Sequence, residues 1–232
     1  NASGPFEAAG ITFFGDNADN TDIGVNDFQI TSNTIKNITN QRAGVPSSTV
    51  LIGGEYSDLG DDHQVTDNTL VEGAVIRYST STPDTDDALN ATSNWWGSQN
   101  GPSAGSENTY NDGNQGAGVS DNVEFTPWLN ASTDNNGQPF APVTNSSGGQ
   151  FASIGSATEV ATPDGTITVK NGTYSEEGGI SIDVEGVTLK SAEPGGATID
   201  LTDAEDPGNA IAATAVQIKA ADVTVDGFEI AG

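Results

Sequence analysis

The chain has 232 residues, with 33 Asp and Glu against 6 Lys and Arg, so its net charge is −27. This charge excludes binding to nucleic acid and direct insertion into anionic membranes, because both depend on clusters of Lys and Arg. The acidic side chains repel one another in dilute salt. In brine the Debye length falls to about 3 Å and the repulsion is screened, so the composition predicts a protein that works at high salt.

The apolar residues predict β structure. Leu, Ile, Val and Phe make up only about 20% of the chain, which approaches the composition of disordered proteins. However, Ile and Val greatly outnumber Leu, and they occur in short runs separated by Gly, Asn and Asp. That rhythm is typical of strands and turns, and no stretch has a helical period.

The chain contains an internal repeat, with three copies in the first hundred residues and a similar segment near residue 225. Residues 28–35 (FQITSNTI) parallel residues 63–70 (HQVTDNTL), residues 89–96 (LNATSNWW) echo them, and residues 223–230 (VTVDGFEI) have the same shape. Asn33, Asn68, Asn94 and Gly227 are expected to form the corner between two strands in each copy, because Asn and Gly tolerate positive φ best. Stacked Asn side chains can also hydrogen-bond as a ladder. Irregular repeats of about 20 to 35 residues indicate a solenoid.

The middle of the chain holds the largest apolar group, Trp95, Trp96 and Trp128. We expect these residues to form a structural cap over the last repeat, and a platform on which sugars stack is the alternative. Residues 130–149 are rich in Asn, Ser, Gly and Pro and are expected to be a polar linker. Residues 150–232 follow as many runs of three to four apolar residues, which are too short for the strands of an ordinary sandwich.

Several motifs resemble one family. Phe151-Ala-Ser-Ile154, Asp164 to Val169, Asn171-Gly-Thr-Tyr174 with Glu176, Gly186 to Leu189 and Ala197 to Asp200 resemble the start of secreted right-handed parallel β-helix proteins. These proteins belong to the pectate-lyase-like superfamily and are NosD-like. Asn94 to Gly97, Gly101-Pro102 and Val123 to Leu129 resemble the end of such proteins, in the form common in haloarchaeal surface proteins. The resemblance implies an all-β, three-sheet β-helix without implying an enzyme, because many members are non-catalytic.

The order of these motifs is reversed. Residues 1–129 are similar to the end of a β-helix, and residues 150–232 are similar to the start of one. Joining Gly232 to Asn1 produces a natural strand, turn and next repeat. We therefore expect an assembly seam between these residues, either between stacked copies or between tandem repeats of one long chain. An arbitrary end of the sequence is the alternative.

Other candidate sites are weaker. The six sequons, which place glycosylation candidates in an extracellular or cell-surface protein, are at Asn1, Asn37, Asn90, Asn130, Asn145 and Asn171. Three acidic clusters, expected to be solvated surface, are Asp16, Asp19 and Asp22; Asp58, Asp61 and Asp62; and Asp84, Asp86 and Asp87. No cofactor or metal is expected, although structural Ca²⁺ would suit such oxygens. His63, the single imidazole, has no partners spaced for a catalytic triad.

The sequence thus predicts a structural, non-catalytic subunit of an extracellular filament, fibre or cell-surface coat, whose partners are copies of itself. Two alternatives stay open. One is a carbohydrate-active β-helix enzyme or viral tailspike that cleaves polysaccharides, and the other is an adhesin module that binds surface glycans without assembling.

Dialysis to millimolar salt is expected to loosen or unfold the protein, because a net charge of −27 is then unscreened. Far-ultraviolet circular dichroism before and after dialysis measures the change. An unchanged spectrum in dilute salt would contradict the high-salt prediction.

Overall fold

A computed structural model describes residues 8–13, 28–36, 47–54, 63–71, 75–80, 88–120, 122–176, 179–201 and 214–232. In these residues the chain is all-β, with short strands, one six-residue α-helix and two short 3-10 helices. The chain forms two compact units. Unit 1 comprises Asn1–Ala104 and Gln115–Pro139, and unit 2 comprises Gly105–Asn114 and Phe140–Gly232. Within the described ranges, no helix is both long and apolar enough to cross a membrane.

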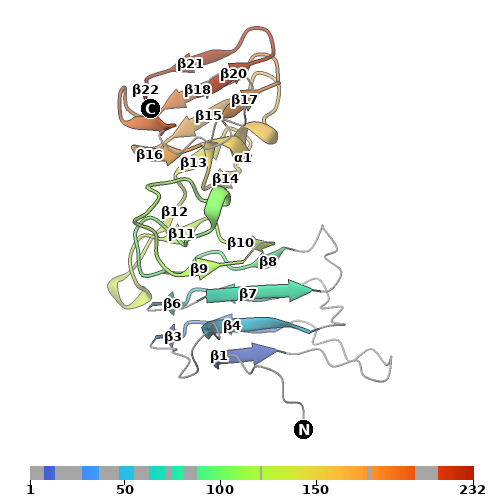
Figure 1. Cartoon of the computed structure of the whole chain (residues 1–232), viewed down its shortest axis with the longest axis vertical. Coiled ribbons are helices and arrows are strands. Elements are labelled where there is room, and N and C mark those ends of the chain that lie inside the picture. The colour runs from blue at the N-terminus through green and yellow to red at the C-terminus, as the bar shows by residue number, and fades with distance from the viewer. Residues whose placement is uncertain are drawn as a thin grey trace. The chain divides into compact units, whose positions relative to one another are not determined.

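Unit 1 is built from three parallel sheets, with strand orders β1-β4-β7-β9, β2-β5-β8-β10 and β3-β6. The chain visits the three sheets in the same order each time, and Figure 1 shows β1, β4 and β7 stacked with their arrows aligned. We term each pass through the three sheets a layer. The strands of these sheets are β1 (Ala8–Phe13), β2 (Gln29–Thr31), β3 (Thr34–Ile35), β4 (Ser47–Gly54), β5 (Gln64–Thr66), β6 (Thr69–Leu70), β7 (Val75–Thr80), β8 (Leu89–Asn90), β9 (Gly118–Val119) and β10 (Val123–Glu124), and β11 (Trp128–Leu129) lies outside these three sheets.

The internal repeat of the sequence sets the register of these sheets. Gln29 pairs with Gln64 and Gln64 with Asn90, which are the pairs that the aligned repeats predict. The ring of Phe28 stacks on that of His63 with 4.3 Å between centroids, so the first residues of two repeats also coincide. Equivalent residues of the repeats therefore pair with one another.

Unit 2 also consists of three sheets that the chain visits in a fixed order. Their strand orders are β14-β13-β15-β18-β21, β16-β19-β22 and β17-β20. All pairs are parallel except those that β13 makes with β14 and β15. The elements are β13 (Val143–Asn145), β14 (Gln150–Phe151), α1 (Ile154–Glu159), β15 (Thr166–Val169), β16 (Gly172–Ser175), β17 (Ile180–Ile182), β18 (Thr188–Ser191), β19 (Ala197–Asp200), β20 (Val216–Ile218), β21 (Thr224–Asp226) and β22 (Phe228–Ala231).

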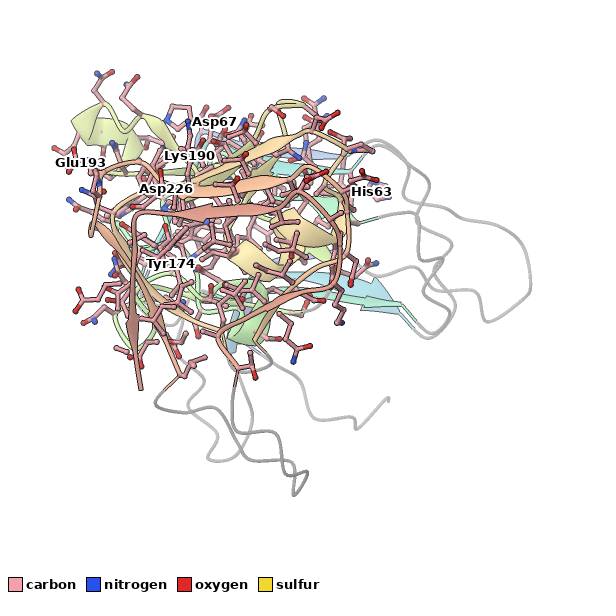
Figure 2. The ribbon with its side chains drawn as sticks, turned by 90° about the horizontal axis from the view of Figure 1, so that it is seen from above. His63, Asp67, Tyr174, Lys190, Glu193 and Asp226 are labelled. Atoms are coloured by element: carbon pink, nitrogen blue, oxygen red, sulfur yellow. The ribbon has the colours of Figure 1, made fainter. Side chains whose placement is uncertain are left out.

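Each strand of unit 2 alternates between an apolar inner side and a polar outer side. Leu189 is fully buried, whereas its neighbour Lys190 is exposed, as the twofold period of a strand requires. Lys190 pairs in register with Asp226, and Figure 2 shows the two side by side on the outside of the sheet. Columns of aliphatic residues thus form the core, and the charges face solvent.

Residues 130–149, expected to be a polar linker, contain short regular elements, and the boundary between the two units falls among them at Pro139. They contain the 3-10 helix η2 (Thr133–Asn135), β12 (Pro139–Phe140) and β13. Val143 is fully buried, and β13 is a central strand of its sheet. The polar residues build turns: Oδ1 of Asn145 accepts from the backbone N–H groups of Ser147 and Gly149, at 3.1 and 2.8 Å. Asn and Ser in this stretch therefore serve compact structure rather than flexibility.

Candidate functional site

The corner between β2 and β3 in unit 1 is held by a ladder of asparagines. The backbone N and Nδ2 of Asn33 donate to Oδ1 of Asn68, at 2.9 and 3.1 Å. The same two atoms of Asn68 donate to Oδ1 of Asn94, at 2.9 and 3.0 Å. The predicted Asn ladder is therefore present, and every bond in it points from one layer to the next.

The amides of the ladder also bind backbone carbonyls inside the stack. Nδ2 of Asn68 donates to the carbonyls of Ile30 and Thr66, at 2.8 and 2.9 Å, and Nδ2 of Asn94 donates to the carbonyl of Val65. Asn68 and Asn94 are fully buried, whereas Asn33 is exposed. Buried amides with all of these partners fix the position of the corner, because an unmatched polar group there is costly.

The expectation that the asparagines themselves adopt positive φ is wrong. The residues with positive φ are those just before them, Ser32 (60°), Asp67 (57°) and Ser93 (57°). Gly227 (77°) aligns with these residues in the ungapped repeat, so Phe228 rather than Gly227 stands in the Asn position. The corner needs two different properties, a left-handed residue and then an inward amide, and Asn supplies the second.

Asn68→Ala is expected to lower the free energy of unfolding by about 3 kcal/mol, because it removes the Nδ2 that donates to the buried carbonyl of Ile30 and the Oδ1 that accepts from Asn33. Asn33→Ala, at the exposed end, is expected to cost about 1 kcal/mol, because water replaces the lost bonds. Urea unfolding in molar salt, followed by circular dichroism, measures both. Equal losses of unfolding free energy in the two variants would contradict the argument that the buried position of Asn68 makes its hydrogen bonds worth more than those of Asn33.

The tryptophans lie inside unit 1. Trp96 and Trp128 are fully buried, Trp95 is half-buried and bridges Thr69, and Nε1 of Trp128 donates to the carbonyl of Gln99 at 3.0 Å. Gly101 has a φ of 77°, and a Cβ there would lie 2.8 Å from the Trp128 ring. The enclosed rings of Trp96 and Trp128 present no face to a sugar, which favours the cap over the stacking platform.

A buried carboxylate, Glu176, holds the start of the short helix in unit 2. The sequence motifs include Glu176 but predict no role for it. Helix α1 packs against β13, β14, β15 and β17. Oε1 of Glu176 accepts from the backbone N of Ile154 at 2.8 Å and from Oγ1 of Thr109 at 2.9 Å, and Oε2 accepts from the N of Gly155 at 3.3 Å. Glu176 therefore joins the first residues of α1 to the segment at residues 105–114.

Burial dominates the ionisation of this group. Burial raises the pKa of the Glu176 carboxyl above its ordinary value, against the hydrogen bonds from Ile154, Thr109 and Gly155, which lower it. Beside it, burial raises the pKa of Tyr174, whose hydroxyl donates to the carbonyl of Lys170 at 2.8 Å. In the window between its unfolded and folded pKa, the folded Glu176 holds more protons than the unfolded one. The free energy of unfolding therefore falls as the pH rises through that window.

Glu176→Gln is expected to remove this fall, because the variant keeps an acceptor oxygen but never carries the charge. The measurement is urea unfolding in molar salt between about pH 4 and about pH 8, compared with wild type. Glu185→Gln, which removes an exposed carboxylate, is the matched control. If both variants follow the same pH profile, Glu176 is not the group responsible.

The last layer of unit 2 exposes the residues that should form its core. Ile218, Val225 and Ile230 are 54%, 37% and 58% exposed. They pair in register with Ile182, Leu189 and Ile199, which are at most 1% exposed. Strands β20, β21 and β22 are also the edges of their three sheets. This apolar edge is the most unusual surface in the described residues.

In unit 1, β1, β2 and β3 each end their sheet among the described residues. Their polar positions Gln29, Thr31 and Thr34 are exposed, whereas Ile30 and Ile35 are buried. Gly232, at the expected seam, is exposed next to β22, and Asn1 lies outside the described residues. The seam between Gly232 and Asn1 stays a prediction.

The remaining candidates are spread over the chain. Asn130 and Asn171 are exposed, Asn90 and Asn145 are half-buried, and Asn37 lies outside the described residues, as do all three acidic clusters. Among the residues that the structure describes, no three His, Asp or Glu side chains gather as metal ligands would. His63 is buried against Phe28 inside unit 1. The glycosylation of the sequons stays a prediction.

Comparison with known proteins finds no match. No family model matches the sequence, and no curated protein or solved structure is similar to it. The resemblance to secreted β-helix proteins therefore remains an expectation drawn from the motifs.

Proposed function

We propose that the chain is a structural subunit of an extracellular filament, fibre or cell-surface coat in a salt-loving organism. Copies stack head to tail or follow one another as tandem repeats. The observation that carries the proposal is the apolar edge of β20, β21 and β22, where Ile218, Val225 and Ile230 are exposed. The proposed role is structural rather than catalytic, and the motifs of the sequence do not imply an enzyme.

We also propose that each unit is a short right-handed parallel β-helix of the pectate-lyase-like, NosD-like type. Three observations support this fold: the chain visits three sheets in a fixed order, nearly all pairs are parallel, and successive layers keep one register. In a β-helix each layer covers the apolar residues of the layer before it. A layer without a successor therefore leaves apolar residues exposed.

An exposed edge of this kind favours assembly. Edge strands offer unpaired backbone groups, and natural proteins protect them with charge, Pro, bulges or a covering element. Here the inward positions of the edge carry aliphatic side chains, in a chain whose net charge is −27. A further layer would satisfy the backbone and bury the aliphatic residues together, and high salt would screen the repulsion between acidic copies.

The outer surface fits an extracellular role in this proposal. Asn130 and Asn171 lie exposed within sequons, so glycans attached there would project from the stack. Nδ2 of Asn171 donates to Oε2 of Glu193 at 2.7 Å, so glycosylation at this site requires that bond to open. Asn130 is therefore the better acceptor of the two.

Ile230→Asp is expected to weaken assembly by at least about tenfold, because the seam loses a buried aliphatic side chain worth about 2 kcal/mol and gains a buried charge. Val160→Asp is the matched control, since Val160 is 54% exposed but lies at the end of α1, away from the edge. Sedimentation and negative-stain electron microscopy in molar salt compare both with wild type, and circular dichroism checks folding.

Wild-type chains are expected to form filaments whose abundance rises with concentration, and the Val160 variant is expected to do the same. Wild type that sediments as a single chain at every concentration and salt would overturn the proposed function. So would an Ile230→Asp variant that assembles as well as wild type.

A further inference from the structure

The last layer of unit 2 has the same plan as the first layer of unit 1. Residues 223–230 align without a gap to residues 28–35. Val225 and Ile30 each stand two residues before a residue with positive φ, Gly227 and Ser32 respectively. Strands β21 and β2 end just before these residues, and β22 and β3 follow them. The corners of the two layers thus share one arrangement of strand, left-handed residue and strand.

The Asn ladder is incomplete at Asn33. Nδ2 of Asn68 contacts three acceptors: the carbonyl of Thr66, Oδ1 of the next Asn, and the carbonyl of Ile30 in the layer before. Among the described residues, Nδ2 of Asn33 has the first two kinds alone, the carbonyl of Thr31 at 3.0 Å and Oδ1 of Asn68. The contact that a preceding layer supplies is the one that Asn33 lacks.

The acceptor side of Asn33 is open as well. Oδ1 of Asn68 accepts from the N and Nδ2 of Asn33, and Oδ1 of Asn94 accepts from those of Asn68. No described residue donates to Oδ1 of Asn33, which is exposed. A preceding layer would present a backbone N–H at this place.

We infer that the preceding layer is β20–β22 of a second copy, in the register that places Val225 beside Ile30 and Phe228 beside Asn33. The N–H of Phe228 then donates to Oδ1 of Asn33, as the N–H of Asn33 does to Asn68. Nδ2 of Asn33 donates to the carbonyl of Val225, as that of Asn68 does to Ile30. This inference rests on the proposed assembly and specifies its interface.

The ladder also determines the polarity of the assembly. Each Oδ1 in the ladder accepts from the Asn of the layer before it, so Oδ1 of Asn33 is placed to accept from a layer that stands before it. Two β1–β3 edges facing each other would leave both acceptors open. The contact is therefore head to tail, a heterologous interface of the kind that extends into filaments. Val225 then continues the aliphatic column of Ile30 and Val65.

Cysteine pairs test this register, because the chain contains no Cys. Thr224 and Gln29 are both exposed and stand opposite each other in the inferred register. Neighbouring strands lie about 4.8 Å apart, within reach of a short bifunctional thiol reagent. An equimolar mixture of Thr224→Cys and Gln29→Cys chains, assembled in molar salt, is expected to give covalent dimers on a denaturing gel.

The control mixture combines Thr224→Cys chains with Thr31→Cys chains. In the inferred register these two residues are two positions apart along the strand, about 6.6 Å. The control mixture is expected to cross-link at least about fivefold less efficiently than the matched mixture. Asp226→Cys with Thr31→Cys is a second matched pair for the same register. Electron microscopy confirms that each mixture assembles before the reagent is added.

Filaments in which the shifted pair cross-links as well as the matched pairs, or in which no pair does, would overturn the inferred register and leave the proposed assembly standing. Wild-type chains that never assemble would overturn both. Matched pairs that cross-link selectively in filaments support the register and the polarity together.

Discussion

Every described strand depends on another strand stacked directly above or below it. The strands are two to eight residues long, and isolated strands of that length are not stable. Parallel stacking in one register aligns aliphatic residues into columns such as Ile167, Leu189 and Val225. The column is closed where a further element covers it and open where none does. Leu189 is therefore fully buried, whereas Val225 is exposed.

Part of this organisation could be predicted from the sequence, because strands that stack on one another at equivalent positions have similar sequences. The asparagines of the repeat at residues 28–35 and 63–70 predicted the ladder, and the same alignment agrees with the pairing of Gln29 with Gln64 in the structure. The conformation of the corner could not be predicted from residue preference, because burial selects Asn for its amide and leaves positive φ to Ser32 and Asp67. The tight turns of residues 130–149 could not be predicted either, since polar composition does not distinguish a flexible chain from a hydrogen-bonded turn.

The role of Glu176 lay beyond sequence reasoning for a related reason. Glu176 and Ile154 stood within the quoted motifs, but a carboxylate among 33 acids carries no sign that it is buried. Only the fold brings it to the first residues of α1, where it accepts from Ile154 and Gly155. The apolar edge could not be predicted from the sequence either, because Ile218 and Ile230 look like ordinary core residues until their neighbours in space are known.

Cryo-electron microscopy of assembled chains in molar salt tests the central claim most directly. The account predicts filaments in which parallel strands continue without interruption from β20–β22 of one copy to β1–β3 of the next, with Phe228 stacked on Asn33. Discrete particles, or filaments in which another element covers Ile218, Val225 and Ile230, would contradict it.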